Sequence, residues 1–192
     1  AILAQGLQGP CTLKKLSLVA CELDDTGLFL IGEALTKNEA LEILDLRNNN
    51  FAHNGASQFF DLLPKLKGLK AVYGLVDDNK RNGVVPTEAV GMALVAGLRK
   101  NTKLQKISDD NDFNGRTGDS YFAPDVAREI NFYLGLNRRG RILLRLSGRS
   151  EPPSGLWPRV LAKLSSPRDT SLLFYFLQNK PKIVRFKAAA SR

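Results

Sequence analysis

Four segments that share one frame decide the fold: LKKLSLVACEL from Leu13, LEILDLRNNNF from Leu41, LKAVYGLVDDN from Leu69 and LQKISDDNDF from Leu104. The first three start 28 residues apart, and the fourth follows after 35. The longer interval fits one unit with an insertion of about seven residues near Asn79 to Pro86. Apolar residues at helical spacing follow the first two frames, so each unit predicts a short strand and then a helix.

The start of the third unit has an alternative. The string DDNxxNG occurs from Asp77 and again from Asp109, which supports a rival register with a unit starting at Val72. We keep Leu69, because the 28-residue spacing is the stronger constraint. Residues 1–12 parallel the helix ends of later units and are expected to form a partial unit. Since a repeat buries its apolar edge only against a neighbour, we expect this chain to be a C-terminal fragment of a longer protein.

The ninth residues of the four frames are Cys21, Asn49, Asp77 and Asp112. A small polar group there can hydrogen-bond the backbone that turns from strand to helix, so Cys21 is predicted to be structural and not a nucleophile. In frame, length and this ninth position, the units resemble the ribonuclease-inhibitor-like subclass of leucine-rich repeats, over residues 1 to about 134. The resemblance implies an α/β fold: a right-handed leucine-rich-repeat solenoid with parallel strands on its concave face and helices on its convex face. Gly74 and Asp109 depart from the frame where a leucine is expected.

The repeats stop near Arg138, which predicts two domains: leucine-rich repeats over 1–137, with units from 13, 41, 69 and 104, and a basic helical C-terminal cap over 138–192. Apolar residues at helical spacing predict helices over 156–164 and 171–179 in this cap. Residues 1–137 hold 15 Lys plus Arg and 17 Asp plus Glu, while 138–192 hold 13 and 2. The whole surplus of +9 therefore comes from the cap. The candidate anion-binding residues are Arg138, Arg139, Arg141, Arg145 and Arg149, with a solvated face of the cap as the alternative.

The sequence gives no support for catalysis, because it lacks GxxxxGK[ST], GxGxxG, GxSxG and HExxH motifs. Asp110 to Gly115 matches the opening of a calcium loop, but Tyr121 stands where the bidentate Glu belongs, so a polar loop is predicted. His53 is the only histidine and has no second ligand at metal-binding spacing, which favours a structural or solvated role. We expect no enzyme, no cofactor and no metal site.

Two cysteines, Cys11 and Cys21, can close at most one small loop, which favours an intracellular, cytoplasmic protein. The longest apolar run is the seven residues Ser171 to Leu177, against the ~18 to 20 needed to span a bilayer. No transmembrane segment is expected.

The strand frame also predicts which side chains meet a partner. Its leucines should point inward and the intervening residues outward, because strand side chains alternate. The candidate partner-binding residues are Ser17, Val19, Asp45, Arg47, Tyr73, Leu75, Ser108 and Asp110. Since Tyr and Arg often anchor interfaces, we predict a non-catalytic protein–protein interaction scaffold that binds through the concave face.

Three alternatives to this scaffold stay open. The sheet face could be solvated without a partner. The chain could regulate a GTPase or another enzyme in trans, although the GTPase-activating proteins that resemble this repeat class carry an acidic tail and this tail is basic. The basic tail could bind membrane lipid or nucleic acid. The insertion near Asn79 to Pro86 is a further candidate contact.

Overall fold

The structure is a computed structural model that describes residues 2–9, 12–76, 87–107, 122–145, 156–164 and 170–181. The chain divides into two compact units, Ala1–Leu134 and Gly135–Arg192. The predicted calcium-like loop from Asp110, the insertion from Asn79 and the residues Cys11, Asp77 and Asp112 lie outside the described ranges.

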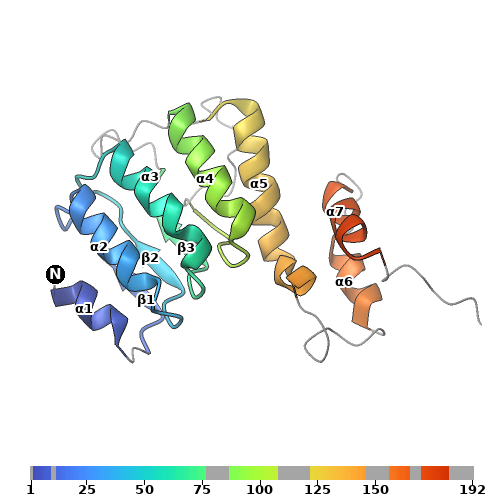
Figure 1. Ribbon diagram of the computed structural model, residues 1–192, viewed down its shortest axis with the longest axis horizontal. Coiled ribbons are helices and arrows are strands. Elements are labelled where there is room, and N and C mark those ends of the chain that lie inside the picture. Colours follow the sequence, from blue (N-terminus) through green and yellow to red (C-terminus); the bar gives the residue numbers. More distant parts are fainter. Residues whose placement is uncertain are drawn as a thin grey trace, which may run out of the picture. The chain divides into compact units, whose positions relative to one another are not determined.

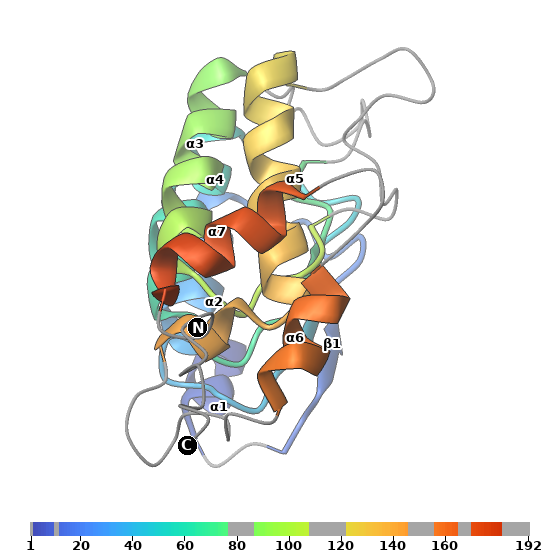
Figure 2. The same ribbon diagram turned by 90° about the vertical axis from the view of Figure 1, so that its right-hand side faces the viewer.

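The first unit contains a three-stranded parallel sheet in the order β1-β2-β3. The strands are β1 (Lys15–Ser17), β2 (Ile43–Asp45) and β3 (Ala71–Tyr73). Its helices are α1 (Ile2–Gln8), α2 (Asp25–Leu35), α3 (His53–Leu62), the 3-10 helix η1 (Leu63–Lys65), α4 (Glu88–Lys100) and α5 (Pro124–Arg138), which runs into the second unit. Helices α2, α3 and α4 lie side by side in chain order (Figure 1), and α5 follows beside α4 (Figure 2).

The strand register follows the 28-residue spacing. Lys15 pairs with Ile43, and Ile43 pairs with Ala71. An isolated bridge then joins Ala71 to Lys106. A unit starting at Val72 would offset this pairing by three residues, so the observed pairing does not follow the rival register.

The core of the first unit lies between the sheet and the helices. The strands contribute fully buried Leu44 and Val72, and the segment after β2 contributes Phe51, Phe59 and Phe60. Helices α3 and α4 approach closely at Gly97, where an added Cβ would lie 2.5 Å from the carbonyl oxygen of Phe60. A side chain at this position would push the two helices apart.

Short polar side chains set the ends of the helices. The Asp24 carboxylate accepts a 2.7 Å hydrogen bond from Gly27 N and caps α2, and Thr87 caps α4 through Val90 N. Helix α3 has no cap of its own at Ala52; instead the Asp25 carboxylate, from α2, accepts from Ala52 N at 2.6 Å. The Asp25 carboxylate therefore also joins α2 to the segment that begins α3.

The predicted ribonuclease-inhibitor-like, right-handed leucine-rich-repeat solenoid with a helical cap is wrong. The described part of the chain is mostly helical, and its only strands are three of three residues each. In the frame from Leu104, the described residues 104–107 add a single bridge, at Lys106. The physical reason is that leucines are lost from the frame after Leu69, at Gly74 and Asp109, so the sheet does not continue as a repeated element.

The second unit contains the 3-10 helix η2 (Arg141–Arg145) and the helices α6 (Trp157–Leu164) and α7 (Ser171–Asn179). Trp157, Leu172 and Phe176 are buried. Both helices lie where the apolar spacing predicted them. Within the described ranges, every helix is too short or too polar to cross a lipid bilayer.

Candidate protein-binding surface

The sheet presents a face of mixed polar character on the side away from its core leucines. The middle of this face is one row of three paired positions, Ser17, Asp45 and Tyr73. Ser17 is exposed at the β1 edge, Asp45 is buried in the centre, and Tyr73 is half-buried on β3. We call the side chains on this side of the sheet the outer face.

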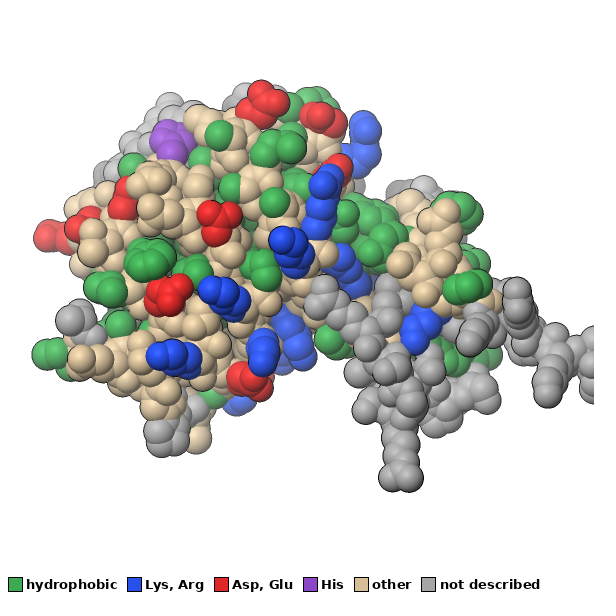
Figure 3. Space-filling model, viewed as in Figure 1, with side chains coloured by type: hydrophobic (Ala, Val, Ile, Leu, Met, Phe, Trp, Pro, Cys, Tyr) green, Lys and Arg blue, Asp and Glu red, His purple; other side chains and the backbone are tan. Residues whose placement is uncertain are grey.

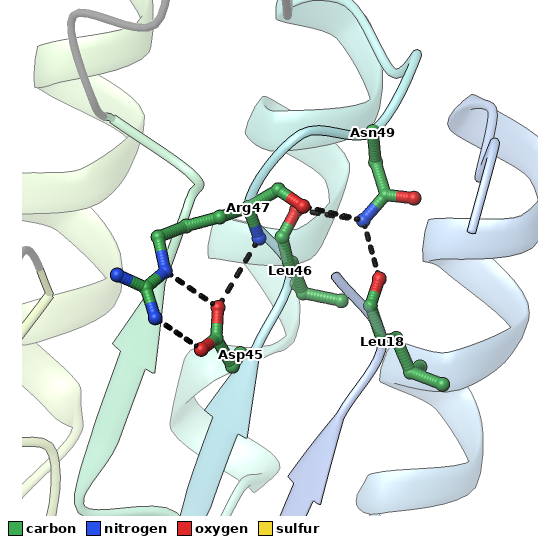
Figure 4. A network of polar contacts seen from close by, with 5 residues as sticks. All are labelled: Leu18, Asp45, Leu46, Arg47 and Asn49. Carbon is green, nitrogen blue, oxygen red and sulfur yellow. Dashed lines mark hydrogen bonds and ion pairs between the residues drawn. The ribbon is translucent and has the colours of Figure 1, made fainter. Parts of the chain in front are cut away.

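Arg47 covers Asp45 with a bidentate ion pair. Its Nε donates to Oδ1 of Asp45 at 2.9 Å, and one terminal nitrogen donates to Oδ2 at 2.6 Å. The backbone N of Arg47 also donates to Oδ1 at 3.3 Å. Figure 4 shows the guanidinium folded back over the carboxylate. Paired, planar bonds of this kind hold both side chains in one geometry.

Two cations lie near the ring of Tyr73. The Arg47 guanidinium carbon is 5.8 Å and the Lys106 Nζ is 5.2 Å from the ring centroid. Both distances fall within the range of a cation–π interaction. Asp45, Arg47, Tyr73 and Lys106 thus form one connected group, which we call the Tyr73 cluster.

Asn49 supports the Tyr73 cluster from the core side. Its side-chain amide donates to the carbonyl oxygens of Leu18 at 2.8 Å and Leu46 at 2.7 Å (Figure 4). Its Oδ1 accepts from the backbone N of Cys21 and of Leu23, each at 3.0 Å. This is the role predicted for the ninth residue of the frame: one buried amide satisfies the turning backbone of two successive segments.

One candidate contact residue is not on the outer face. Leu75 was predicted to point outward, but its side chain is fully buried in the core. Gly74 gives the reason: its φ of +85° breaks the alternation of the strand and turns Leu75 inward, in place of the leucine missing from the frame. Val19 is half-buried, and Ser108 and Asp110 lie outside the described residues.

A charged row beside the strands was missed by the sequence analysis. Glu42 lies between Lys14 at 3.5 Å and Lys70 at 2.7 Å. The hydrogen bond from Lys70 lowers the pKa of Glu42 below its ordinary value. The signal was available, because positions 14, 42 and 70 carry Lys, Glu and Lys at the 28-residue spacing that sets residues side by side. We call these three residues the Glu42 row.

The ion pair of Asp45 with Arg47 should make the stability of the chain depend on pH. The hydrogen bond from Arg47 lowers the pKa of Asp45 below its ordinary 3.8, against the opposing effect of burial. The pair's contribution to stability is therefore present above the unfolded pKa and is lost as pH falls through the lower folded pKa. In Arg47→Ala the side-chain bonds are lost while burial remains, so the Asp45 pKa should rise in a carboxyl carbon NMR titration. Lys65→Ala is the control, and an unmoved Asp45 titration in Arg47→Ala would contradict the pairing.

One of the predicted anion-binding arginines of the basic tail is buried. Arg141 is only 6% exposed, and its guanidinium lies 6.0 Å from the ring centroid of Tyr175, so its assignment to an exposed anion-binding cluster is wrong. Arg138 is exposed and Arg139 half-buried. The side chain of Arg145 and all of Arg149 lie outside the described structure.

The remaining reactive side chains do not gather in the part of the chain that is described. No three His, Cys, Asp or Glu side chains there form a group that could hold a metal ion. His53 is half-buried at the first position of α3. Cys21 has an exposed free thiol, 3.5 Å from the Val19 carbonyl oxygen.

No protein-family profile and no curated protein sequence matches the chain. Solved structures are similar to it, among them the following two. A leiomodin-1 fragment described as actin-binding site 2 has 19% sequence identity and a TM-score of 0.59, over 74% of this chain and 73% of that one. A tropomodulin C-terminal domain from Caenorhabditis elegans has 13% identity and a TM-score of 0.48, over 74% and 94%. The likeness to the leiomodin-1 fragment gives the fold of this chain, in place of the ribonuclease-inhibitor-like solenoid that the repeats predicted.

Proposed function

We propose that the chain is a non-catalytic, intracellular protein-interaction module and that its partner docks on the outer face of the sheet. The Tyr73 cluster is the basis of this proposal, since it presents an aromatic ring and an arginine that is held in a fixed geometry. Side chains that are already ordered lose little conformational entropy on binding, and Tyr and Arg are the residues that most often dominate interfaces.

Actin is the first partner to test. The leiomodin-1 fragment with the similar fold is named for actin binding, and the shared fold makes a shared kind of partner a reasonable starting hypothesis. Regulation of an enzyme in trans would use the same docking step. Binding of lipid or nucleic acid by the tail has less support, because Arg141 is covered.

The experiment compares wild type with the double variant Arg47→Ala plus Tyr73→Ala. Binding to monomeric actin by light scattering and fluorescence anisotropy, and to filaments by cosedimentation, would be measured first. Proteins captured from cell extract and then purified would follow as further partners. The double variant should bind at least tenfold more weakly, because it removes both anchors of the Tyr73 cluster.

A matched control removes one aromatic and one cation from the helix side of the molecule, Phe29→Ala plus Lys37→Ala; both side chains are exposed. Circular dichroism and the urea midpoint would establish that both double variants are folded. Equal binding by the two would show that the partner docks elsewhere.

A further inference from the structure

Among the described residues, the outer face and its margin carry more cations than carboxylates, although the unit that holds them is not cationic. Residues 1–137 carry a net charge of −2. On the described outer face and in the adjoining Glu42 row there are five cations against two carboxylates, a local net charge of +3. The cations are Lys14, Lys15, Arg47, Lys70 and Lys106, and the carboxylates are Glu42 and Asp45.

Both carboxylates of this surface are already engaged by neighbouring cations. Asp45 is held by Arg47, and Glu42 by Lys70 and Lys14; the pKa of each is lowered, as expected for a carboxylate kept ionised by its neighbours. Lys14 and Lys70 still expose 66% and 48% of their side chains. The engaged carboxylates therefore leave cationic surface in contact with water.

The helix side of the first unit differs. There the acidic residues are distributed along the helices, with Glu33 on α2, Asp61 on α3, Glu88 on α4 and Glu129 on α5. Figure 3 shows acidic and basic side chains intermingled over these helices. The described part of the unit is thus polarised, with its local cationic excess on the sheet side, and a charged partner would be oriented toward that side.

We infer that the outer face binds an acidic segment of a protein, whose carboxylates meet Lys15 and Lys106 while its chain passes beside Tyr73. This inference rests on the proposed function and names the chemistry of the partner. A protein segment is favoured over a polyanion such as nucleic acid because the cations surround one half-buried ring and an ion pair, not a continuous basic groove.

The strand register predicts how far apart the carboxylates of the bound segment lie. Lys15, Ile43, Ala71 and Lys106 lie in one row across the sheet, so Lys15 and Lys106 are three strand spacings apart. At about 4.8 Å per spacing this is about 14 Å, which an extended chain covers in about four residues. The preferred segment would therefore carry acidic residues at i and i+4, with apolar or small residues between them.

The probe is a labelled 12-residue peptide with Glu at positions i, i+4 and i+8 in a Ser, Thr and Val background, beside the same peptide with Gln at those positions. Amide shift changes in wild-type protein should map to the strands and the row beside them for the Glu peptide and be much smaller for the Gln peptide. Affinity should fall at least tenfold between 50 and 300 mM salt, because exposed charges are screened. Equal mapping by the two peptides, or mapping to the helices, would overturn the inference.

Lys15→Gln plus Lys106→Gln should weaken binding of the Glu peptide at least tenfold. Lys37→Gln plus Lys65→Gln removes the same charge from the turn after α2 and from the last residue of η1, and should leave binding unchanged. The same variants separate this inference from the proposed function. Suppose that a protein partner loses binding in Arg47→Ala plus Tyr73→Ala, but that neither the lysine substitutions nor salt change its affinity. The docking face would then be supported and the acidic segment contradicted. A partner whose affinity is unchanged by all of these substitutions and by salt would contradict both the docking face and the acidic segment.

Discussion

Asn49→Ala is expected to lower the free energy of unfolding by about 3–4 kcal/mol, a large share of the total for a domain of this size. Asn49 is fully buried, and its amide makes hydrogen bonds to two carbonyl oxygens and two backbone N–H groups. Its removal leaves these groups without their partner, and each unsatisfied buried group costs about 1–3 kcal/mol, less where water can reach it. Water can reach the exposed Cys21, which is why the expected total stays below the full sum.

The measurement is urea unfolding followed by circular dichroism, with the slope of the transition compared between variants so that a change in midpoint reports stability. Asn50→Ala is the matched control. Asn50 is exposed, and its hydrogen bond to the Leu23 carbonyl comes from the backbone N, which alanine keeps. The control should change stability by less than about 0.5 kcal/mol. A loss in Asn49→Ala as small as that of Asn50→Ala would mean that the amide does not hold these segments together.

Gly74→Ala is expected to destabilise the chain by about 2–4 kcal/mol. The residue has a φ of +85°, which costs a non-glycine residue about 1–3 kcal/mol. In addition, an added Cβ would lie 2.5 Å from the backbone N of Arg47 and 2.6 Å from the carbonyl carbon of Leu46. These are backbone atoms, which cannot swing away as a flexible side chain would, so β2 and β3 must separate locally.

The same substitution should disturb binding, because the segment that moves carries Arg47. We expect the Asp45 pKa to rise in Gly74→Ala as the ion pair loosens, and any partner of the outer face to bind more weakly. Gly6→Ala is the control, since nothing lies within 4 Å of a Cβ at that position of α1 and alanine favours helix by up to about 1 kcal/mol. A Gly74→Ala variant as stable as Gly6→Ala would contradict the close approach of the two strands.

The sequence predicted local features better than architecture. The 28-residue spacing of the frames predicted which positions of β1, β2 and β3 pair. The helical period predicted α2 and α3, because it depends on residues close together in the chain. The class of fold was wrong. Whether strand–helix units continue as a solenoid depends on how many of them pair, and in the described part of the frame from Leu104 the pairing is limited to Lys106.

The errors in the candidate site have local causes that residue type does not reveal. Leu75 occupies an outward position of the frame, and only the left-handed backbone of Gly74 turns it into the core. Arg141 belongs to a dense run of arginines, yet a contact with Tyr175, 34 residues later in the chain, covers it. The net charge of the first unit is also a poor guide, since its near neutrality conceals the cationic excess among the described residues of the sheet side.

The bonds of Asn49 have a consequence for the dynamics of the chain. Because one side chain closes both its own turn and the turn 28 residues earlier, the amide hydrogens of Cys21 and Leu23 should exchange with solvent only when the β2 turn opens. The two turns then form a single cooperative opening unit in the sense of native-state hydrogen exchange. The protection of the edge strand β1 from exchange would then depend on Asn49, a residue outside that strand.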